Sequence, residues 1–181
     1  LVERVAESFT PLALAHGSRV EAATPGACIA HVDGSLLRQA LLNLLDNALK
    51  YGPAKQTIRV GSSLEPQRVL LWVEDEGPGV PVEERARIWE PYFRRPTHRE
   101  SAVAGSGIGL SVVRDVAEAH GGSARVTDGD DGGARFVIEL PANVMAANGV
   151  GGGAARVRDA KASPAIPKPA PATLRYGADG P

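Results

Sequence analysis

Three side chains on one expected helix could bind a phosphate group and its metal ion. Apolar residues recur at helical spacing over residues 35–50, which predicts an amphipathic helix there. Asn43, Asn47 and Lys50 follow at i, i+4 and i+7 on a different stripe of that helix. Mg²⁺ prefers hard oxygen ligands and takes few of them from protein, so an amide oxygen near a lysine suits a metal-bound polyphosphate. Taken alone, the stripe is more typical of a solvated polar face.

A carboxylate and two glycines follow an expected strand in the segment Val73–Val80, which reads Val-Glu-Asp-Glu-Gly-Pro-Gly-Val. Asp75 would end the strand, where a buried carboxylate can accept a hydrogen bond from the amine of a base. Gly77 and Gly79 would let the backbone approach a ligand closely. Taken alone, the segment also fits a plain turn between a strand and a helix.

A glycine-rich turn, Gly105-Ser106-Gly107-Ile108-Gly109-Leu110, leads into a helix expected over 108–119. Such turns present free N–H groups to anions. The turn is not a Walker loop, because no Lys-Ser/Thr pair follows, and no strand precedes it as a dinucleotide-binding motif would require. The preceding segment, 91–107, is polar and long for a loop, which indicates a functional lid.

These groups need a scaffold, and the rest of the pattern predicts an α+β fold with two layers, in which helices are segregated from an antiparallel sheet. The hairpin of strands 58–64 and 68–75 would turn around Glu65-Pro66-Gln67. The other expected elements are a helix over 1–16, strands over 18–22 and 27–31, a short helix over 81–89, and closing strands at Val126 and 135–140.

Composition excludes several classes of protein. The 181 residues carry 20 Lys and Arg against 21 Asp and Glu, and the net charge of −1 argues against a strongly basic nucleic-acid binder. The single cysteine, Cys28, excludes an internal disulfide framework and a multi-cysteine metal site. No apolar run is long enough to cross a bilayer and no signal peptide is visible. Because the chain starts at Leu1, we expect a piece of a longer protein or a processed chain.

The 21 glycines and 14 prolines fall into two populations, of which one lies in the turns described above. The other lies in residues 142–181, where Gly, Ala and Pro make up more than half of the sequence without any helix or strand period. Such a composition buries too little apolar surface to offset the entropy of ordering. We therefore expect one domain over 1–141 and a disordered tail over 142–181.

Four of these motifs, in this order, resemble the N, G1, F and G2 boxes of bacterial sensor histidine kinases. The matching segments are Asn-Leu-Leu-Asp-Asn-Ala-Leu-Lys-Tyr at 43–51, Asp-Glu-Gly-Pro-Gly at 75–79, Glu-Pro-Tyr-Phe-Arg at 90–94 and Gly-Ser-Gly-Ile-Gly-Leu at 105–110. The resemblance covers about 1–141. It implies the catalytic ATP-binding domain of such a kinase and the Bergerat fold, a two-layer α/β sandwich. The sheet would be mixed and mostly antiparallel, with the helices on one face.

The resemblance also implies roles at matching positions, with ATP and Mg²⁺ as ligands. Asn47 would coordinate Mg²⁺, and Asp75 would bind the adenine amino group. Phosphate contacts would come from Asn43, Lys50 and Arg94. The remaining implied nucleotide-binding residues flank the nucleotide, shape the base pocket or form the lid and its hinge: Tyr51, Gly77, Gly79, Phe93, Gly105, Gly107, Ile108, Gly109 and Leu110.

Asn43 also bears on the reaction. Hydrolytic relatives, and the related serine kinases, place a glutamate at this position as a general base, and an amide cannot accept a proton at neutral pH. A neutral imidazole needs no such activation, which favours transfer to a histidine. An anti-sigma type of serine kinase and a nucleotide-binding regulatory module are the alternatives.

The histidine that would accept the phosphoryl group is not in this sequence. None of the four histidines, His16, His31, His98 and His120, is followed by the acidic and then basic residue of the family pattern. We therefore assign no catalytic residue. We expect a histidine-bearing helical-hairpin domain as the partner, a response regulator indirectly, no nucleic acid and a monomeric fragment. The resemblance implies a cytoplasmic domain whose parent protein lies in the bacterial inner membrane.

Overall fold

The structure, a computed structural model, describes residues 1–24, 32–94, 106–130 and 132–142. They belong to one compact unit, Leu1–Ala146, and only that unit is described below. The strand expected over 27–31, most of the expected lid and nearly all of the expected tail lie outside the described residues. Those expectations, including the division of the chain at residue 141, therefore stay predictions.

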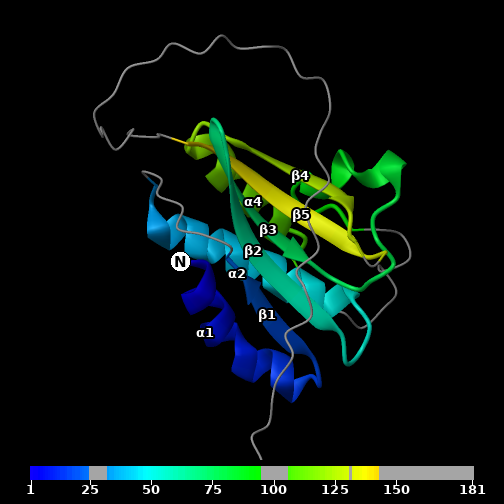
Figure 1. Ribbon diagram of the computed structural model, residues 1–181. Helices are drawn as coiled ribbons and strands as arrows, with labels where there is room; N and C mark the ends of the chain where they lie inside the picture. Colours follow the sequence, from blue (N-terminus) through cyan, green and yellow to red (C-terminus); the bar gives the residue numbers. More distant parts are fainter. Residues whose placement is uncertain (25–31, 95–105, 131, 143–181) are drawn as a thin grey trace, which may run out of the picture. The chain divides into compact units, whose positions relative to one another are not determined.

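A mixed, mostly antiparallel sheet of five strands forms one layer, as predicted (Figure 1). The order across the sheet is β1-β2-β3-β5-β4, in which β1 and β2 are parallel and the other neighbours are antiparallel. The strands are β1 (Arg19–Ala23), β2 (Thr57–Glu65), β3 (Arg68–Glu74), β4 (Ser123–Asp128) and β5 (Ala134–Pro141). The central position of β3 puts its C-terminal end beside the start of β5.

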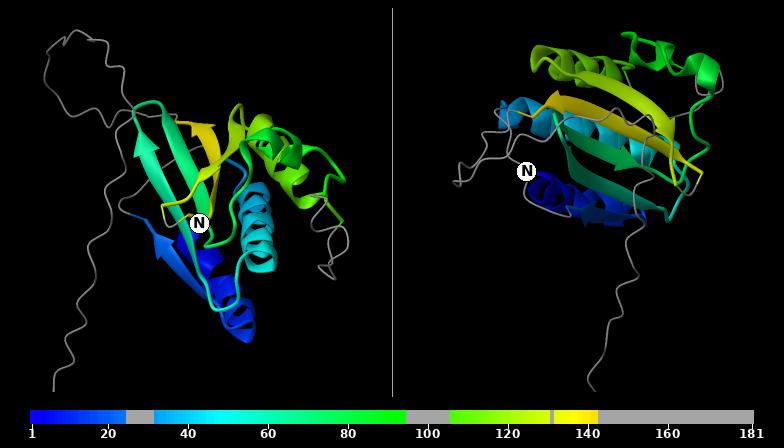
Figure 2. Two further views of the ribbon diagram at one scale, coloured as in Figure 1. Left: turned by 90° about the vertical axis from the view of Figure 1, so that its right-hand side faces the viewer. Right: turned by 45° about the horizontal axis from the view of Figure 1, so that its top comes forward.

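Within the described residues, three helices form the second layer and pack on one face of the sheet, which confirms the predicted architecture (Figure 2). They are α1 (Val2–Ala15), α2 (Gly34–Tyr51) and α4 (Gly109–Ala119). The helix expected over 81–89 is instead two short 3₁₀ turns, η1 (Val82–Glu84) and η2 (Arg87–Trp89). The side chain of Arg85 between them donates to the carbonyl of Val80 and pairs with Asp128 on β4.

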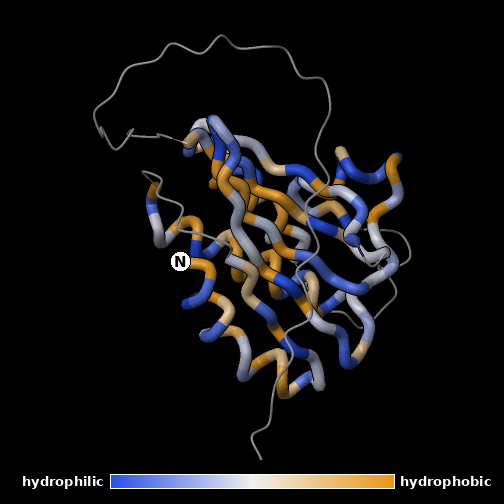
Figure 3. Tube along the Cα trace, in the orientation of Figure 1, coloured by the Kyte–Doolittle hydropathy of each residue, from blue (hydrophilic) through white to orange (hydrophobic). Residues whose placement is uncertain are grey.

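The core lies between the layers, because each helix buries its apolar stripe against alternate residues of the strands. In Figure 3, apolar residues gather along the central strands and the helices behind them. The stripe of α2 is fully buried and consists of Leu37, Ala40, Leu41, Leu44, Leu45 and Ala48. None of the helices that the structure describes is long and apolar enough to cross a membrane.

Hydrogen bonds tie α2 to α4 at two places. At the N-terminal end of α2, the backbone N–H of Asp33 donates to Nε2 of His120 over 3.0 Å. Because Nε2 accepts this bond, the ring proton of a neutral His120 is on Nδ1. That Nδ1 lies 2.7 Å from the carbonyl of Val116. At the other end, the side-chain amide of Asn43 donates to the carbonyl of Gly109 over 3.4 Å. The antiparallel pair thus presents the middle of α2 beside the first turn of α4.

Candidate functional site

A cavity of about 90 Å³ opens at the end of the sheet where β3 stops and β5 begins. Its walls come from α2, the turn after β3, η2 and the segment after it, the start of α4 and the start of β5. The lining residues are Asn47, Tyr51, Asp75, Pro78, Gly79, Val80, Ile88, Phe93, Arg94, Leu110, Ala134 and Phe136. The cavity therefore joins residues of all four sequence motifs, the fourth through Leu110 at the start of α4.

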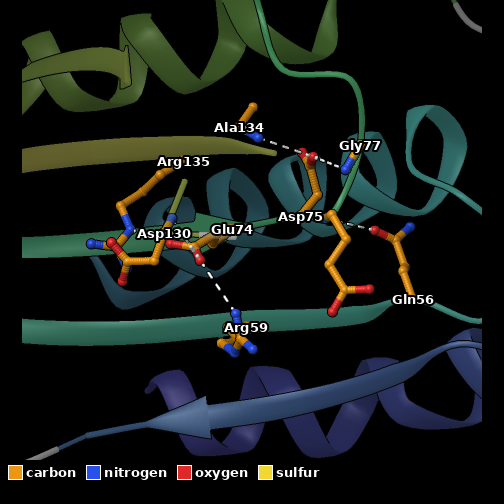
Figure 4. Close-up of polar contacts among 9 residues, drawn as sticks. Gln56, Arg59, Glu74, Asp75, Gly77, Asp130, Ala134 and Arg135 are labelled. Carbon is orange, nitrogen blue, oxygen red and sulfur yellow. Dashed lines mark hydrogen bonds and ion pairs between the residues drawn. The ribbon is translucent and has the colours of Figure 1, made fainter. Parts of the chain in front are cut away.

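Asp75 is the buried acidic group of this cavity, with 7% of its surface exposed. Its Oδ1 accepts two backbone hydrogen bonds, from Gly77 over 2.8 Å and from Ala134 over 3.1 Å (Figure 4). Both described hydrogen bonds of the carboxylate therefore end on the same oxygen. The second oxygen, Oδ2, is the one available to a hydrogen-bond donor that enters the cavity.

Burial raises the pKa of Asp75 above its ordinary value, because a charged carboxylate is poorly solvated there. The N–H groups of Ala134 and Gly77 oppose this shift, and the negative charge of Glu74 adds to it. A carboxylate in such an environment gains more from a donor that replaces water than an exposed one does. The site is thus suited to a polar ligand with an N–H group.

Two glycines around Asp75 are required by their surroundings. A Cβ on Gly133 would lie 1.7 Å from the carbonyl oxygen of Asp75, and a Cβ on Gly77 would lie 2.8 Å from its Oδ1. Gly79 has a φ of +70°, which side-chain-bearing residues rarely adopt. The backbone thus closes tightly around the carboxylate at Gly77 and Gly133. The roles predicted for Gly77 and Gly79 in the base pocket stay predictions, and Gly133 was not among the predicted site residues.

The polar stripe of α2 divides into three environments. Asn47 lines the cavity. Asn43 is half-buried against α4, where it accepts a 3.2 Å bond from Gln39 as well as donating to Gly109. Lys50 turns along the helix surface to pair with Asp46, with Nζ and Oδ2 2.5 Å apart. Among these, only Asn47 faces the cavity directly, and the roles predicted for Asn43 and Lys50 stay predictions.

The expected lid is described only at its ends. The N–H of Tyr92 donates to the carbonyl of Gly107 over 2.9 Å, and a Cβ on Gly107 would come within 3.0 Å of the Tyr92 backbone. Phe93 and Arg94 lie on the cavity wall, and the guanidinium of Arg87 stacks over the Phe93 ring at 4.8 Å. The two ends of the segment therefore meet beside the cavity.

Of the residues predicted from sequence, the cavity brings together Asn47, Tyr51, Asp75, Gly79, Phe93, Arg94 and Leu110. Gly105 lies outside the described residues. The remaining predicted residues do not line it: Asn43, Lys50, Gly77, Gly107, Ile108 and Gly109.

Sequence reasoning did not select Pro78, Val80, Ile88, Ala134 and Phe136, which also line the cavity. Pro78 and Val80 lie inside the segment Val73–Val80 with its two glycines, and Phe136 lies in the closing strand expected over 135–140. Ile88 and Ala134 carry no signal beyond their apolar character. Apolar lining residues are hard to find in a sequence because the core uses the same residue types.

Gln56 was also missed, although it links two elements of the site. Its side chain is buried, with 1% exposed, and its Nε2 donates to the carbonyl of Ala48 over 2.7 Å. Its Oε1 accepts from the N–H of Glu76 over 3.3 Å, as Figure 4 shows. Gln56 therefore fixes the turn after β3 to the end of α2. A buried glutamine in a short loop gives no sequence signal that separates it from an exposed one.

Comparisons with known proteins match these features. Residues 32–144 match the family described as "Histidine kinase-, DNA gyrase B-, and HSP90-like ATPase". The chain is 35% identical over 144 residues to the sensor histidine kinase TmoS of Ectopseudomonas mendocina, which covers 79% of this chain and 15% of that protein. The chain thus spans well under a quarter of the length of this curated relative.

Two solved structures share the architecture. The mycobacterial sensor histidine kinase MprB superimposes with a TM-score of 0.63 at 32% identity, covering 77% of this chain and 91% of that chain. Full-length ShkA, solved in complex with AMPPNP, gives a TM-score of 0.66 at 33% identity and covers 77% of this chain and 29% of that chain.

Proposed function

We propose that this chain, which belongs to the family of histidine kinase-, DNA gyrase B- and HSP90-like ATPases, binds Mg-ATP in its cavity and transfers the γ-phosphoryl group to a histidine of a separate helical-hairpin domain. The observation that carries the proposal is the buried Asp75. Its Oδ1 is held by two backbone N–H groups, and its Oδ2 is available at the cavity. It supports recognition of adenine, whose exocyclic amine is a hydrogen-bond donor.

The base would lie between apolar walls. Val80, Ile88 and Phe136 line the cavity around Asp75, and flat aromatic bases gain from such contacts. The tight glycines Gly77 and Gly79 leave the space beside the carboxylate free of side chains. Guanine presents a carbonyl oxygen where adenine has its amine, so a carboxylate there would reject it.

The phosphates would lie toward α4 and the ends of the expected lid. Arg94 on the cavity wall supplies a cation, and Asn47 supplies an amide oxygen. Within the described ranges, no group of three or more His, Cys, Asp or Glu residues could hold a metal ion by itself. The donors therefore fit a Mg²⁺ ion that arrives with the nucleotide and takes most of its ligands from phosphate and water. When bound, such an ion neutralises charge on the transferring group.

Asn43 supports transfer to a histidine over hydrolysis. Its amide carries no basic lone pair, and it donates to the carbonyl of Gly109. In the transfer, a bond forms between the γ-phosphorus and the neutral ring nitrogen of the acceptor histidine while the bond to the β-phosphate oxygen breaks, and ADP leaves. The residues of this chain would orient the nucleotide for that attack.

The remaining parts of the system belong to the proposal as well. The acceptor domain would be an upstream region of the same protein or a separate chain, and a response regulator would receive the phosphoryl group from it. We infer a cytoplasmic location for this domain, with the parent protein in the bacterial inner membrane.

The proposal is tested by mixing the chain with radiolabelled Mg-ATP and a candidate helical-hairpin domain. We expect label on the partner that is stable to alkali and labile to acid, as phosphohistidine is. Replacing the partner's histidine with glutamine is the matched control and should abolish the label. ATP binding without any transfer would instead indicate a regulatory nucleotide-binding module, and calorimetry without ATP binding would overturn the proposal.

A further inference from the structure

Glu74 is a buried acidic residue beside the cavity that the proposed function does not use. It precedes Asp75 but points to the face of the sheet opposite the helices, because consecutive residues of a strand alternate between faces. Its side chain is 2% exposed. A buried carboxylate needs charged or polar partners, which are found on three neighbouring segments.

Those partners form an outer-face ion cluster, consisting of Arg59, Glu74, Asp130 and Arg135 (Figure 4). Nε of Arg135 lies 2.5 Å from one oxygen of Glu74, and Nη1 of Arg59 lies 3.4 Å from the other. The N–H of Asp130 also donates to Glu74 over 3.3 Å, and Arg135 reaches the Asp130 carboxylate over 3.0 Å. The cluster thus links β2, β3, β5 and the turn between β4 and β5.

The same strand segments hold Asp75 on the cavity side. Glu74 and Arg135 are directly opposite in the β3–β5 ladder. One residue along, the N–H of Asp75 donates to the carbonyl of Ala134 over 3.0 Å, and the N–H of Ala134 donates to the Asp75 carboxylate over 3.1 Å. The outer-face ion cluster and the carboxylate of the cavity therefore share one stretch of backbone.

The turn between β4 and β5 packs against both acidic residues. A Cβ on Gly129 would lie 3.1 Å from Cγ of Glu74, and a Cβ on Gly133 would lie 1.7 Å from the backbone oxygen of Asp75. Gly129 and Gly133 of the turn therefore pack so closely on the end of β3 that neither position has spare room for a side chain. Removing the charge that holds Asp130 and Arg135 would let the turn move, and with it the N–H of Ala134.

We propose that Glu74 and Arg135 are positioning residues that hold the β4–β5 turn so that Ala134 keeps Oδ1 of Asp75 and leaves Oδ2 to the base. The proposal rests on the proposed function, since it assumes that Asp75 recognises adenine. A buried ion pair contributes little net stability compared with an apolar pair, so its presence here is better explained by the geometry it sets. Glu74 and Arg135 thereby determine specificity without touching the nucleotide.

The chain offers a matched control at the other end of the same sheet. Glu139 on β5 is also paired with two arginines, Arg68 at 2.9 Å and Arg125 at 2.5 Å, but it lies far along the strand from the cavity. We would compare Glu74→Gln with Glu139→Gln by calorimetry with Mg-ATP and Mg-GTP. We would also measure exchange of the Ala134 amide proton by NMR.

In Glu74→Gln, we expect ATP affinity to fall roughly three- to tenfold, the range of one well-placed hydrogen bond, while GTP affinity stays unchanged. Exchange of the Ala134 amide should accelerate. Glu139→Gln should leave the ATP affinity and the exchange rate of the Ala134 amide within twofold of the unmodified chain. General destabilisation would instead weaken ATP and GTP binding together, so an unchanged affinity ratio in Glu74→Gln would overturn the proposal.

Arg135→Lys provides a second variant if Glu74→Gln does not fold. A lysine keeps the charge, but its single ammonium cannot hold Glu74 and Asp130 in the bidentate manner of a guanidinium. The same selective loss of ATP affinity is expected, and its absence would overturn the proposal. If the unmodified chain binds ATP no better than GTP, the proposed function fails together with this inference. An unchanged ratio in the variants, with selective binding in the unmodified chain, overturns only the inference.

Discussion

The two ends of the cavity are built in different ways. At the proposed base end, which comprises Asp75, Gly77 and Ala134, backbone N–H groups hold the carboxylate. At the proposed phosphate end, which comprises Asn43, Asn47 and Lys50, only Asn47 lines the cavity, and the other two side chains bond to Gly109 and Asp46. On the proposed function, the base end is held in place by the backbone, and the phosphate end would exchange contacts when a nucleotide binds.

The difference follows from the elements that carry the two ends. At the end of a strand, the N–H groups of the neighbouring strand are held in place by the ladder of hydrogen bonds. A carboxylate that accepts from them is therefore held in one orientation. A helix surface presents long side chains that find neighbours one turn away in the absence of a ligand. Recognition of the base should therefore depend on backbone geometry, and phosphate binding on side-chain competition.

The largest effect is expected from Gly133→Ala at the base end. The added Cβ would lie 1.7 Å from the backbone oxygen of Asp75, so the ladder between β3 and β5 must shift. We expect the free energy of unfolding to fall by about 3 kcal/mol or more, the upper range for overpacked sites. Thermal and urea unfolding measure this.

The matched substitution at the phosphate end is Gly109→Ala, where the nearest atoms to a Cβ are those of Asn43 at 3.9 Å. Gly109 is in α4, where alanine is the better helix former. The free energy of unfolding of Gly109→Ala should therefore stay unchanged or rise by up to about 1 kcal/mol. Equal losses in Gly133→Ala and Gly109→Ala would contradict a rigid base end.

Asp75→Asn should weaken ATP binding by roughly ten- to a hundredfold, the range for a hydrogen bond to a charged group. The amide can still accept from Gly77 and Ala134 on Oδ1, so the frame survives while the acceptor for the adenine amine becomes a donor. Isothermal titration calorimetry measures the affinity. An affinity within twofold of the unmodified chain would remove Asp75 from base recognition.

The same variant should be more stable than the unmodified chain without nucleotide at neutral pH. The pKa of Asp75 is raised in the folded chain above its ordinary value of 3.8, so the folded state holds more protons between the two pKa values. The contribution of Asp75 to the free energy of unfolding therefore falls as pH rises through that window and stays lower above it. Unfolding curves of both proteins from acid to neutral pH test this, and a difference that does not vary with pH would contradict the sign.

Asn47→Asp should weaken Mg-ATP binding by about tenfold, because it places a second negative charge near the phosphates. ADP carries less negative charge and should lose less affinity than ATP. Equal losses for the two nucleotides would indicate that Asn47 does not lie at the phosphate end.

The smallest effect is expected from Asp46→Asn, which removes the ion pair of Lys50 without touching the cavity. Exposed pairs of this kind contribute less than about 1 kcal/mol, so stability should hardly change. If Lys50 reaches a phosphate, ATP affinity should rise by up to about threefold, because Lys50 no longer has to leave Asp46. A fall in affinity would show that the pair itself supports the site.

Much of the fold follows from sequence patterns, because apolar periodicity places each element on one side of a single core. The stripe of α2 from Leu37 to Ala48 is buried as the helical period requires, and the hairpin of β2 and β3 has the expected turn. The two 3₁₀ turns were missed, and the segment that carries them is held through Arg85 by Asp128, a tertiary contact that local spacing does not reveal.

The candidate site could be predicted only as far as residue type and spacing reach. Helical spacing put Asn47 and Lys50 on one stripe, yet only Asn47 faces the cavity, because Asp46 lies closer to the lysine. The hydrogen bond from Ala134 to Asp75 and the close approach of Gly133 to the Asp75 backbone both join residues almost sixty positions apart. Such contacts depend on strand register, which a single sequence does not specify in detail.

The hydrogen bond between Tyr92 and Gly107 couples two walls of the cavity that lie apart in the sequence. It joins the segment after η2, which carries Phe93 and Arg94, to the residues just before α4, which carries Leu110. A substitution at Gly107 would therefore be felt on both walls at once, because a Cβ there would come within 3.0 Å of the Tyr92 backbone.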